Sequence, residues 1–287
     1  MRALILGLGY VGTALAEELV ADGYSVMGIR RGVSDEGSVP AGVEMRHGDL
    51  ADASFWDQLD DQFDWVVHCA SSSRGGLDAY REVFEKGSRL LAGWLRGHPP
   101  RRFVFTSSTS VYAQTDGSVV NEESPADGAG ETGRILRSAE DEFLAASEAT
   151  SILRVAGIYG PGRGHLFLKY LADEAQMTGD PRRWLNQIHR ADVVGAIRMI
   201  LSNDAPPPVT IVADDEPVMQ VDFFSWLSER LHKPMPPTAD APKRRKRALT
   251  NKRVSNAGLR RLGFDLRYPT FRDGYLEEMR RRELSIH

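Results

Sequence analysis

The sequence lacks features that would each point to a particular class of protein. Its 287 residues include one cysteine, Cys69, which can form neither an internal disulfide nor a cysteine-rich metal site. No apolar run approaches the roughly 20 residues that a membrane-spanning helix needs. The first residues also lack the longer apolar stretch and the cleavage site of a secretory leader. We therefore expect no membrane segment and a cytoplasmic location.

A general excess of positive charge is missing too. The chain has 36 lysines and arginines against 40 aspartates and glutamates, a formal net charge of −4, so nucleic acid is not an expected partner. Residues 243–287 nevertheless hold 14 basic residues against five acids, with the densest run at 243–247 (KRRKR). We interpret that run as a solvated loop, with contact to an anionic substrate or a cofactor phosphate as the alternative. The isolated His47 and His165 do not make up a metal site by their spacing.

What the sequence does contain, up to about residue 155, is an alternation of short aliphatic runs with longer segments of helical period. This alternation predicts an α/β fold with a Rossmann-type, doubly wound parallel sheet that is flanked by helices. The expected strands cover residues 3–6, 25–29, 43–46, 65–69, 102–105 and 151–154.

Beyond residue 155 the pattern loosens, and glycine and proline become frequent. We expect residues 1–155 to form a dinucleotide-binding domain to which 187–203 return. Residues 156–186 and 204–287 would form a smaller C-terminal α/β lobe that binds the substrate. In that lobe, Asp222 is expected to cap one helix, and residues 270–282 are expected to form another.

A glycine motif, GLGYVG at residues 7–12, lies directly after the first expected strand and opens the first helix. Gly7 permits the tight turn, Gly9 lets a pyrophosphate approach the backbone, and Gly12 lets the helix pack closely on the strand. The phosphates would lie against N–H groups at the positive end of the helix dipole. The motif therefore predicts dinucleotide binding, with Tyr10 and Val11 as its remaining contacts.

The end of the second strand favours one cofactor over the other. An acidic residue there would bond the adenosine ribose hydroxyls, but the chain has Arg30 and Arg31. A guanidinium binds a phosphate in bidentate fashion, so NADP is favoured over NAD; the alternative is two arginines that are merely exposed. Further cofactor contacts are expected after the third and fourth strands, from Asp49 and Leu50 at the adenine and from Ala70 and Ser71 beside the cofactor.

Several other segments are similar to those of a known family. Residues 106–112 (TSSTSVY) resemble its strand-end serine block, and residues 121–125 (NEESP), 153–162 (LRVAGIYGPG) and 188–193 (IHRADV) also match. Over nearly its whole length the chain resembles the extended short-chain dehydrogenases/reductases of the NAD-dependent epimerase/dehydratase type. The resemblance implies a nicotinamide cofactor and a small-molecule substrate that enters between two lobes.

The resemblance breaks where the family carries out its proton chemistry. The family uses a tyrosine four residues before a lysine, and counting back from Ala139 these positions fall on Thr132 and Leu136. A threonine hydroxyl is far too weak an acid, and leucine has no charge with which to tune it. Phe84 likewise stands where the family usually has an asparagine. Hydride transfer is expected to survive, because orientation contributes roughly 7 to 11 kcal/mol against roughly 3 to 5 for one acid or base.

The resemblance also implies roles for residues that are retained. Ser108 aligns with the family's catalytic serine and is expected to hydrogen-bond a substrate carbonyl. Tyr112, the nearest phenol in the sequence, is a second catalytic candidate, with packing as the alternative. The substrate-binding candidates are Ser108, Tyr159, Lys252 and Arg253, of which the last two would contact substrate phosphates unless they are solvated surface residues. His68 is expected to be a hydrogen-bonded core residue, and Asp192 is expected to be a helix cap.

These patterns lead to one leading hypothesis and two rivals. The first is an atypical extended reductase that prefers NADP and transfers hydride to or from a small or nucleotide-linked carbonyl substrate, which a phosphate group would help to bind. The missing tyrosine and lysine motivate a rival, a protein that binds NADP without turnover and reports redox state to a partner. The resemblance alone supports a nucleotide-sugar epimerase/dehydratase. A homodimer is left open.

Overall fold

The computed structural model describes residues 1–32, 39–72, 75–128, 130–239 and 250–286, so the basic run at 243–247 lies outside the described residues. The chain divides into two compact units. The first unit comprises Met1–Val111, Ala126–Arg154 and Val194–Thr210, and the second comprises Tyr112–Pro125, Val155–Val193 and Ile211–His287. Residues 112–125, which the sequence pattern assigns to the first domain, group with the second unit.

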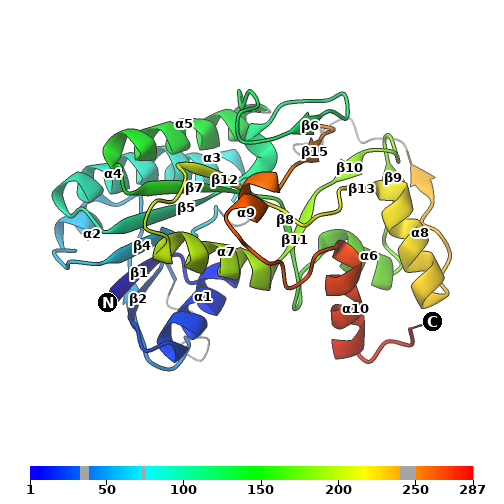
Figure 1. Ribbon diagram of the computed structural model, residues 1–287, viewed down its shortest axis with the longest axis horizontal. Coiled ribbons are helices and arrows are strands. Elements are labelled where there is room, and N and C mark those ends of the chain that lie inside the picture. Colours follow the sequence, from blue (N-terminus) through cyan, green and yellow to red (C-terminus); the bar gives the residue numbers. More distant parts are fainter. Residues whose placement is uncertain (33–38, 73–74, 129, 240–249, 287) are drawn as a thin grey trace. The chain divides into compact units, whose positions relative to one another are not determined.

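The first unit is built on a seven-stranded sheet with the strand order β12-β7-β5-β4-β1-β2-β3 (Figure 1). Its strands are β1 (Arg2–Leu6), β2 (Ser25–Arg30), β3 (Val43–His47), β4 (Trp65–His68), β5 (Arg102–Ser108), β7 (Thr150–Val155) and β12 (Val209–Val212). The pairs among β1 to β5 are parallel, and the order reverses between β1 and β4. This is the predicted doubly wound sheet, and all six expected strands are present.

Strand composition explains why this sheet lies in the interior. Every residue of β4 (WVVH) is buried, as are the last four residues of β1 (ALIL), and such continuous apolar runs are typical of strands that are covered on both faces. Phe103 and Phe105 of β5 pack against Phe143, with ring centroids 5.0 and 4.9 Å apart. Each buried phenylalanine contributes roughly 1.5 to 3 kcal/mol.

Helices cover both faces of the sheet. One face carries α3 (Gly76–Arg81), the π-helical turn η2 (Glu82–Lys86), α4 (Gly87–Gly97) and α5 (Gly130–Ala146), as Figure 1 shows. The other face carries α1 (Tyr10–Ala21) and α7 (Arg190–Ser202), where Arg198 of α7 forms ion pairs with Glu18 and Asp22 of α1. The short α2 (Ala53–Asp57) follows β3, and the 3-10 turn η3 (Thr109–Val111) follows β5. None of the helices in the described ranges is long and apolar enough to cross a membrane.

In the residues that the structure describes, the second unit consists of short strand pairs and the four helices given below. The pairs are β6 (Val119–Val120) with β15 (Arg253–Val254), β8 (Gly157–Tyr159) with β11 (Gln187–His189), β9 (Met177–Thr178) with β14 (Thr238–Ala239), and β10 (Trp184–Leu185) with β13 (Val218–Met219). The helices are α6 (His165–Leu171), α8 (Gln220–Leu231), α9 (Ala257–Arg261) and α10 (Phe271–Arg281). An aromatic core that includes Phe223, Phe271 and Tyr275 joins α6, α8 and α10.

The two helix starts expected in this unit have different outcomes. The prediction for residues 270–282 is confirmed, because Thr270 and Asp273 form a capping box at the start of α10. The prediction that Asp222 caps a helix is wrong, since Met219 is the N-cap of α8 and Asp222 lies in its first turn. Helix α8 begins at Gln220, directly after β13, so its N-cap lies before the position that the acidic residue suggests.

Candidate functional site

The turn between β1 and α1 requires glycine at two positions and leaves a third open. Gly7 has a φ of 102°, and a Cβ there would lie 2.5 Å from Cα of Ala70. A Cβ on Gly12 would lie 2.1 Å from the carbonyl oxygen of Gly7. By contrast, nothing lies within 4 Å of a Cβ placed on Gly9. The backbone beside Gly9 is therefore accessible to an incoming group.

Gly9 is also the N-cap of α1, and no side chain caps this helix end. The first N–H groups of a helix have no partner within the helix and carry the positive end of its dipole. The first turn of α1 contains no acidic residue that would neutralise it. A phosphate fits such a helix end, so the residues present suit a dinucleotide. Tyr10 is half-buried, and Val11 is buried in the core.

Backbone hydrogen bonds bring the ends of β2 and β4 beside this turn. The N–H groups of Gly7 and Leu8 donate to the Ile29 carbonyl at 3.0 and 3.1 Å, and the Cys69 N–H donates to the Leu6 carbonyl at 2.8 Å. The half-buried Arg30 and Ala70 therefore flank the glycines, with Arg31 and Ser71 exposed next to them.

The expected adenine contacts follow β3. Asp49 is exposed, and its Oδ1 accepts a hydrogen bond from the Ala51 N–H at 2.9 Å. Leu50 is buried, and its carbonyl accepts a hydrogen bond from Trp56 Nε1. The structure thus gathers the predicted cofactor residues at one edge of the sheet, while their individual roles stay predictions.

Two adjacent serines at the end of β5 point in opposite directions, as successive strand residues do. Ser107 is buried and donates to Glu140 at 2.5 Å, and Glu140 in turn pairs with Arg154 at 2.7 Å. This triad ties β5 to α5 and β7. Ser108 is half-buried, and its Oγ accepts a hydrogen bond from the Ser110 N–H at 3.1 Å.

The positioning role of Glu140 was missed in the sequence, although a signal was available. In α5, Glu140 repeats the helical face that carries the apolar Leu136 and Phe143. A charged residue on a buried face requires a partner. That face also carries Thr132, which is half-buried, and α5 contains neither tyrosine nor lysine. That Thr132 and Leu136 occupy the family's catalytic positions stays a prediction.

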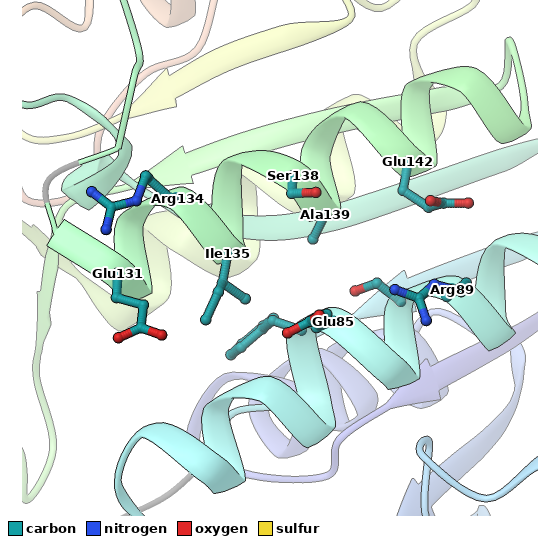
Figure 2. A pocket seen from close by; sticks show the side chains of 10 residues that line it. Glu85, Arg89, Glu131, Arg134, Ile135, Ser138, Ala139 and Glu142 are labelled. Carbon is teal, nitrogen blue, oxygen red and sulfur yellow. The ribbon is translucent and has the colours of Figure 1, made fainter.

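A cavity of about 410 Å³ lies along the other face of α5. Figure 2 shows Glu131, Arg134 and Glu142 along α5, with Glu85 and Arg89 on the facing helical segment. The remaining lining residues are Phe84, Ser88, Ile135, Ser138 and Ala139. The cavity contains neither Ser108 nor any residue of the glycine motif, so it is separate from the edge described above.

In the second unit, the two candidate tyrosines occupy core positions. Tyr112 is fully buried, and its hydroxyl donates to the Asn121 carbonyl at 2.8 Å, which agrees with the packing alternative. Tyr159 is stacked on Tyr275 with ring centroids 4.3 Å apart, and burial raises its pKa well above the ordinary value.

Lys252 and Arg253 differ from the expectation of solvated surface residues. Lys252 is 5% exposed, and its Nζ donates to the Tyr112 carbonyl at 2.9 Å. Burial lowers the pKa of Lys252 to about 8. Arg253 is half-buried, donates to the Gly117 carbonyl at 3.0 Å, and lies over the Trp184 ring at 5.1 Å. Surface solvation is therefore wrong for Lys252, and contact with substrate phosphates stays a prediction for both.

The expectations for two other polar residues need correction. His68 is buried as predicted, but neither ring nitrogen has a hydrogen-bond partner among the described residues. Burial lowers its pKa to about 4, so it is neutral. Asp192 is no helix cap, because α7 begins at Arg190. Asp192 instead accepts hydrogen bonds from the N–H groups of Arg267 and Tyr268, at 2.6 and 3.1 Å.

Comparisons with known proteins agree with this architecture. A family model described as the NAD dependent epimerase/dehydratase family matches residues 3–213. Protein YeeZ of Escherichia coli (strain K12) is 29% identical over 282 residues, which cover 93% of this chain and 96% of that protein. The 2-alkyl-3-oxoalkanoate reductase of Shewanella oneidensis is 30% identical over 257 residues, 79% of this chain and 65% of that protein. A solved structure from Methylobacillus flagellatus, described as a candidate NAD-dependent epimerase/dehydratase, is 30% identical with a TM-score of 0.79 and covers 97% of this chain and 98% of its own.

Proposed function

We propose that this chain, which belongs to the NAD dependent epimerase/dehydratase family, binds a nicotinamide dinucleotide and transfers hydride to or from a carbonyl substrate. The observation that carries the proposal is the turn between β1 and α1. Gly7 and Gly12 have no room for a side chain there, whereas Gly9 opens the backbone at the positive end of α1. This combination suits a pyrophosphate.

Hydride transfer suits the residues of this chain better than epimerisation or dehydration. Those reactions need repeated proton movements, and α5 offers no phenol or amine for them. When bound, the nicotinamide supplies or accepts the hydride. Ser108 is the side chain that we assign to the substrate: its Oγ accepts from the Ser110 N–H, so its own proton is available to a substrate carbonyl oxygen. The relative named as a 2-alkyl-3-oxoalkanoate reductase supports a carbonyl substrate.

For the cofactor we propose NADP rather than NAD. Arg30 ends β2 beside the glycine turn, and a guanidinium at that place suits a ribose phosphate. The Arg30→Asp variant should lower the affinity for NADPH at least tenfold, measured by calorimetry. The affinity for NADH serves as the internal control, and an unchanged ratio of the two affinities would show the assignment to be wrong.

Turnover provides the test of the reductase activity. NADPH oxidation is followed at 340 nm against aldehydes, ketones, 3-oxo acids and nucleotide sugars. We expect at least one carbonyl substrate to be reduced, and Ser108→Ala to lower kcat/KM about 10²-fold. Ser110→Ala is the matched control, because it removes a neighbouring hydroxyl but keeps the N–H that bonds Ser108. Tight NADPH binding without turnover across the panel would overturn the reductase in favour of a redox sensor.

A further inference from the structure

The cavity along α5 lies wholly within the first unit and is large enough for a small molecule. Its volume of about 410 Å³ lies within the range of about 300 to 1,000 Å³ that is typical of small-molecule sites. One wall is α5, and the other is the segment 84–89 of η2 and α4. The π-helical turn η2 interrupts an otherwise α-helical run from Gly76 to Gly97. Such turns are frequently found at functional sites.

The inner part of the cavity is apolar. Phe84 and Ala139 are buried, and Ile135 is half-buried. Figure 2 shows Ile135 and Ala139 on the side of α5 that faces the helical segment with Glu85 and Arg89. An apolar group that enters the cavity is removed from water against these side chains, which favours its binding.

A buried hydroxyl in the cavity wall lacks a hydrogen-bond partner. Ser88 is 1% exposed, and its Oγ has no partner among the described residues. A serine hydroxyl in a helix can bond a carbonyl of the preceding turn, but Ser88 makes no such bond. Burying a hydroxyl without a hydrogen bond is costly. A polar ligand group in the cavity would supply the partner that the protein does not.

Two neighbouring pairs of opposite charge on this helical segment differ in their contacts. Glu82 and Lys86 are four residues apart and form an ion pair at 3.6 Å. Glu85 and Arg89 have the same spacing, but their side chains form no ion pair or hydrogen bond with any described residue. Of the two pairs, the second lines the cavity and the first does not. The cavity therefore presents a carboxylate and a guanidinium one helical turn apart, both of them available to a ligand.

The other charged side chains at the cavity favour a ligand that carries a carboxylate. Glu131 and Glu142 each pair with an arginine that does not line the cavity. Arg134 has no ion pair among the described residues and adds a second guanidinium near the start of α5 (Figure 2). The carboxylates other than Glu85 are thus neutralised, so a plain amine is not the ligand that these charges select.

We propose that this cavity binds a free α-amino acid with an apolar side chain. The ammonium of the ligand donates to the Glu85 carboxylate, and its carboxylate accepts from the Arg89 guanidinium and the Ser88 hydroxyl. Both ligand groups are attached to the same carbon, so together they bridge two side chains that lie one helical turn apart. The apolar side chain of the ligand packs on Ile135 and Ala139. A simple carboxylate would leave Glu85 unpaired, and a simple amine would leave Arg89 unpaired.

Calorimetry with the full-length protein tests this proposal, with L-phenylalanine and L-leucine as the probes. Two analogues of phenylalanine test the charges separately: 3-phenylpropanoate lacks the ammonium, and 2-phenylethylamine lacks the carboxylate. The site variants are Glu85→Gln, Arg89→Gln and Ser88→Ala. The matched controls are Glu82→Gln and Lys86→Gln, which change the paired charges of the same helical segment outside the cavity.

We expect at least one of the two amino acids to bind with a Kd of about 1 mM or below. Each analogue should bind about tenfold more weakly or worse, as should phenylalanine to Glu85→Gln and Arg89→Gln. Ser88→Ala should weaken binding about three- to tenfold, and the controls should stay within about twofold of wild type. In Glu85→Gln the ammonium should no longer contribute, so phenylalanine and 3-phenylpropanoate should bind alike. Glu85 and Arg89 are exposed, so their variants should keep the fold, which circular dichroism checks.

Three binding results would overturn the proposal: no binding of either amino acid at about 10 mM, binding that the site variants leave unchanged, or an analogue that binds wild type as tightly as phenylalanine does. The other occupant to distinguish is a second copy of this chain. Light scattering at two protein concentrations decides this, because a dimer that dissociates in Arg89→Gln, in place of amino-acid binding, would also overturn the proposal. These measurements need neither nicotinamide nor turnover, so their outcome is independent of the proposed function.

Discussion

In the first unit, the buried Glu140 and Arg154 neutralise each other, and Ser107 donates a further hydrogen bond to the carboxylate. In the described part of the second unit, two buried titratable groups lack such a partner. Lys252 bonds one carbonyl, and Asp214 Oδ2 has no hydrogen-bond partner among the described residues. The first unit therefore uses a buried ion pair to fix a strand end, whereas in the second unit burial lowers the pKa of Lys252 and raises that of Asp214.

The strongest way to break this comparison is to remove one half of the pair in the first unit. Glu140→Gln should lower the free energy of unfolding by about 3 to 5 kcal/mol, because it leaves Arg154 as an uncompensated buried charge. Urea denaturation measures this loss. The control is the double variant Glu140→Leu/Arg154→Met, which removes both charges and should recover most of the stability. A loss below about 1 kcal/mol in Glu140→Gln would show that the pair is not tightly buried in solution.

His68 sharpens the comparison, because it is a buried titratable residue of the first unit whose ring nitrogens have no hydrogen-bond partner among the described residues. Its folded pKa is about 4, below the ordinary 6.5, so the unfolded chain binds its proton first as the pH falls. The stability contributed by this neutral histidine is present above pH 6.5 and is lost between pH 6.5 and 4, by about 3 kcal/mol in total. In His68→Leu that part of the loss should be absent. The check is urea denaturation at pH 8, 6 and 4.5. If the free energy of unfolding falls equally with pH in the wild-type protein and in His68→Leu, the prediction is contradicted.

The smallest expected effect tests the second unit. Burial raises the pKa of Asp214 well above the ordinary 3.8, so the folded chain keeps this proton up to a higher pH than the unfolded chain does. The sign is therefore opposite to that of His68: stability falls as the pH rises from about 4 through the folded pKa. Asp214→Asn keeps an acceptor for the Glu216 N–H and removes the charge.

The Asp214→Asn variant should consequently gain stability relative to wild type as the pH rises, and the gain should vanish near pH 4. Thermal unfolding followed by circular dichroism measures the difference. Asp215→Asn is not a suitable control, since Asp215 pairs with Arg260; the exposed Asp180→Asn is better matched, because Asp180 also accepts a bond from the N–H two residues later. A gain that is independent of pH would argue against a titrating Asp214.

Sequence patterns predicted the first unit well, because local rules determine most of it. Aliphatic runs specify the parallel strands, and a glycine with a φ of 102° next to Ala70 leaves little choice of residue at position 7. Sequence patterns predicted the strands of the second unit less well. Its strand pairs are only two or three residues long, too short for a period to be recognised.

The positions of polar residues in the candidate sites were the hardest to predict. The sequence leaves Lys252 as either a contact to substrate phosphate or a solvated surface residue, and its burial and its long-range bond to Tyr112 are visible only in the structure. Asp192 has the spacing of a cap, yet it bonds N–H groups more than 70 residues away, at Arg267 and Tyr268. Bonds between such distant segments depend on tertiary packing, which no local pattern of residues encodes.

The way the two units share the chain also has a consequence for its synthesis. The chain passes between the units at residues 111–112, 125–126, 154–155, 193–194 and 210–211. A truncation after residue 210 keeps every residue of the first unit but only part of the second, and no single truncation yields the second unit alone. On the ribosome, the first unit has all of its residues once position 210 has emerged, whereas the second must await its final segment, which carries Lys252 and α10. Premature termination between residues 210 and 251 therefore removes Lys252 and α10 while leaving the whole glycine turn between β1 and α1 in the product.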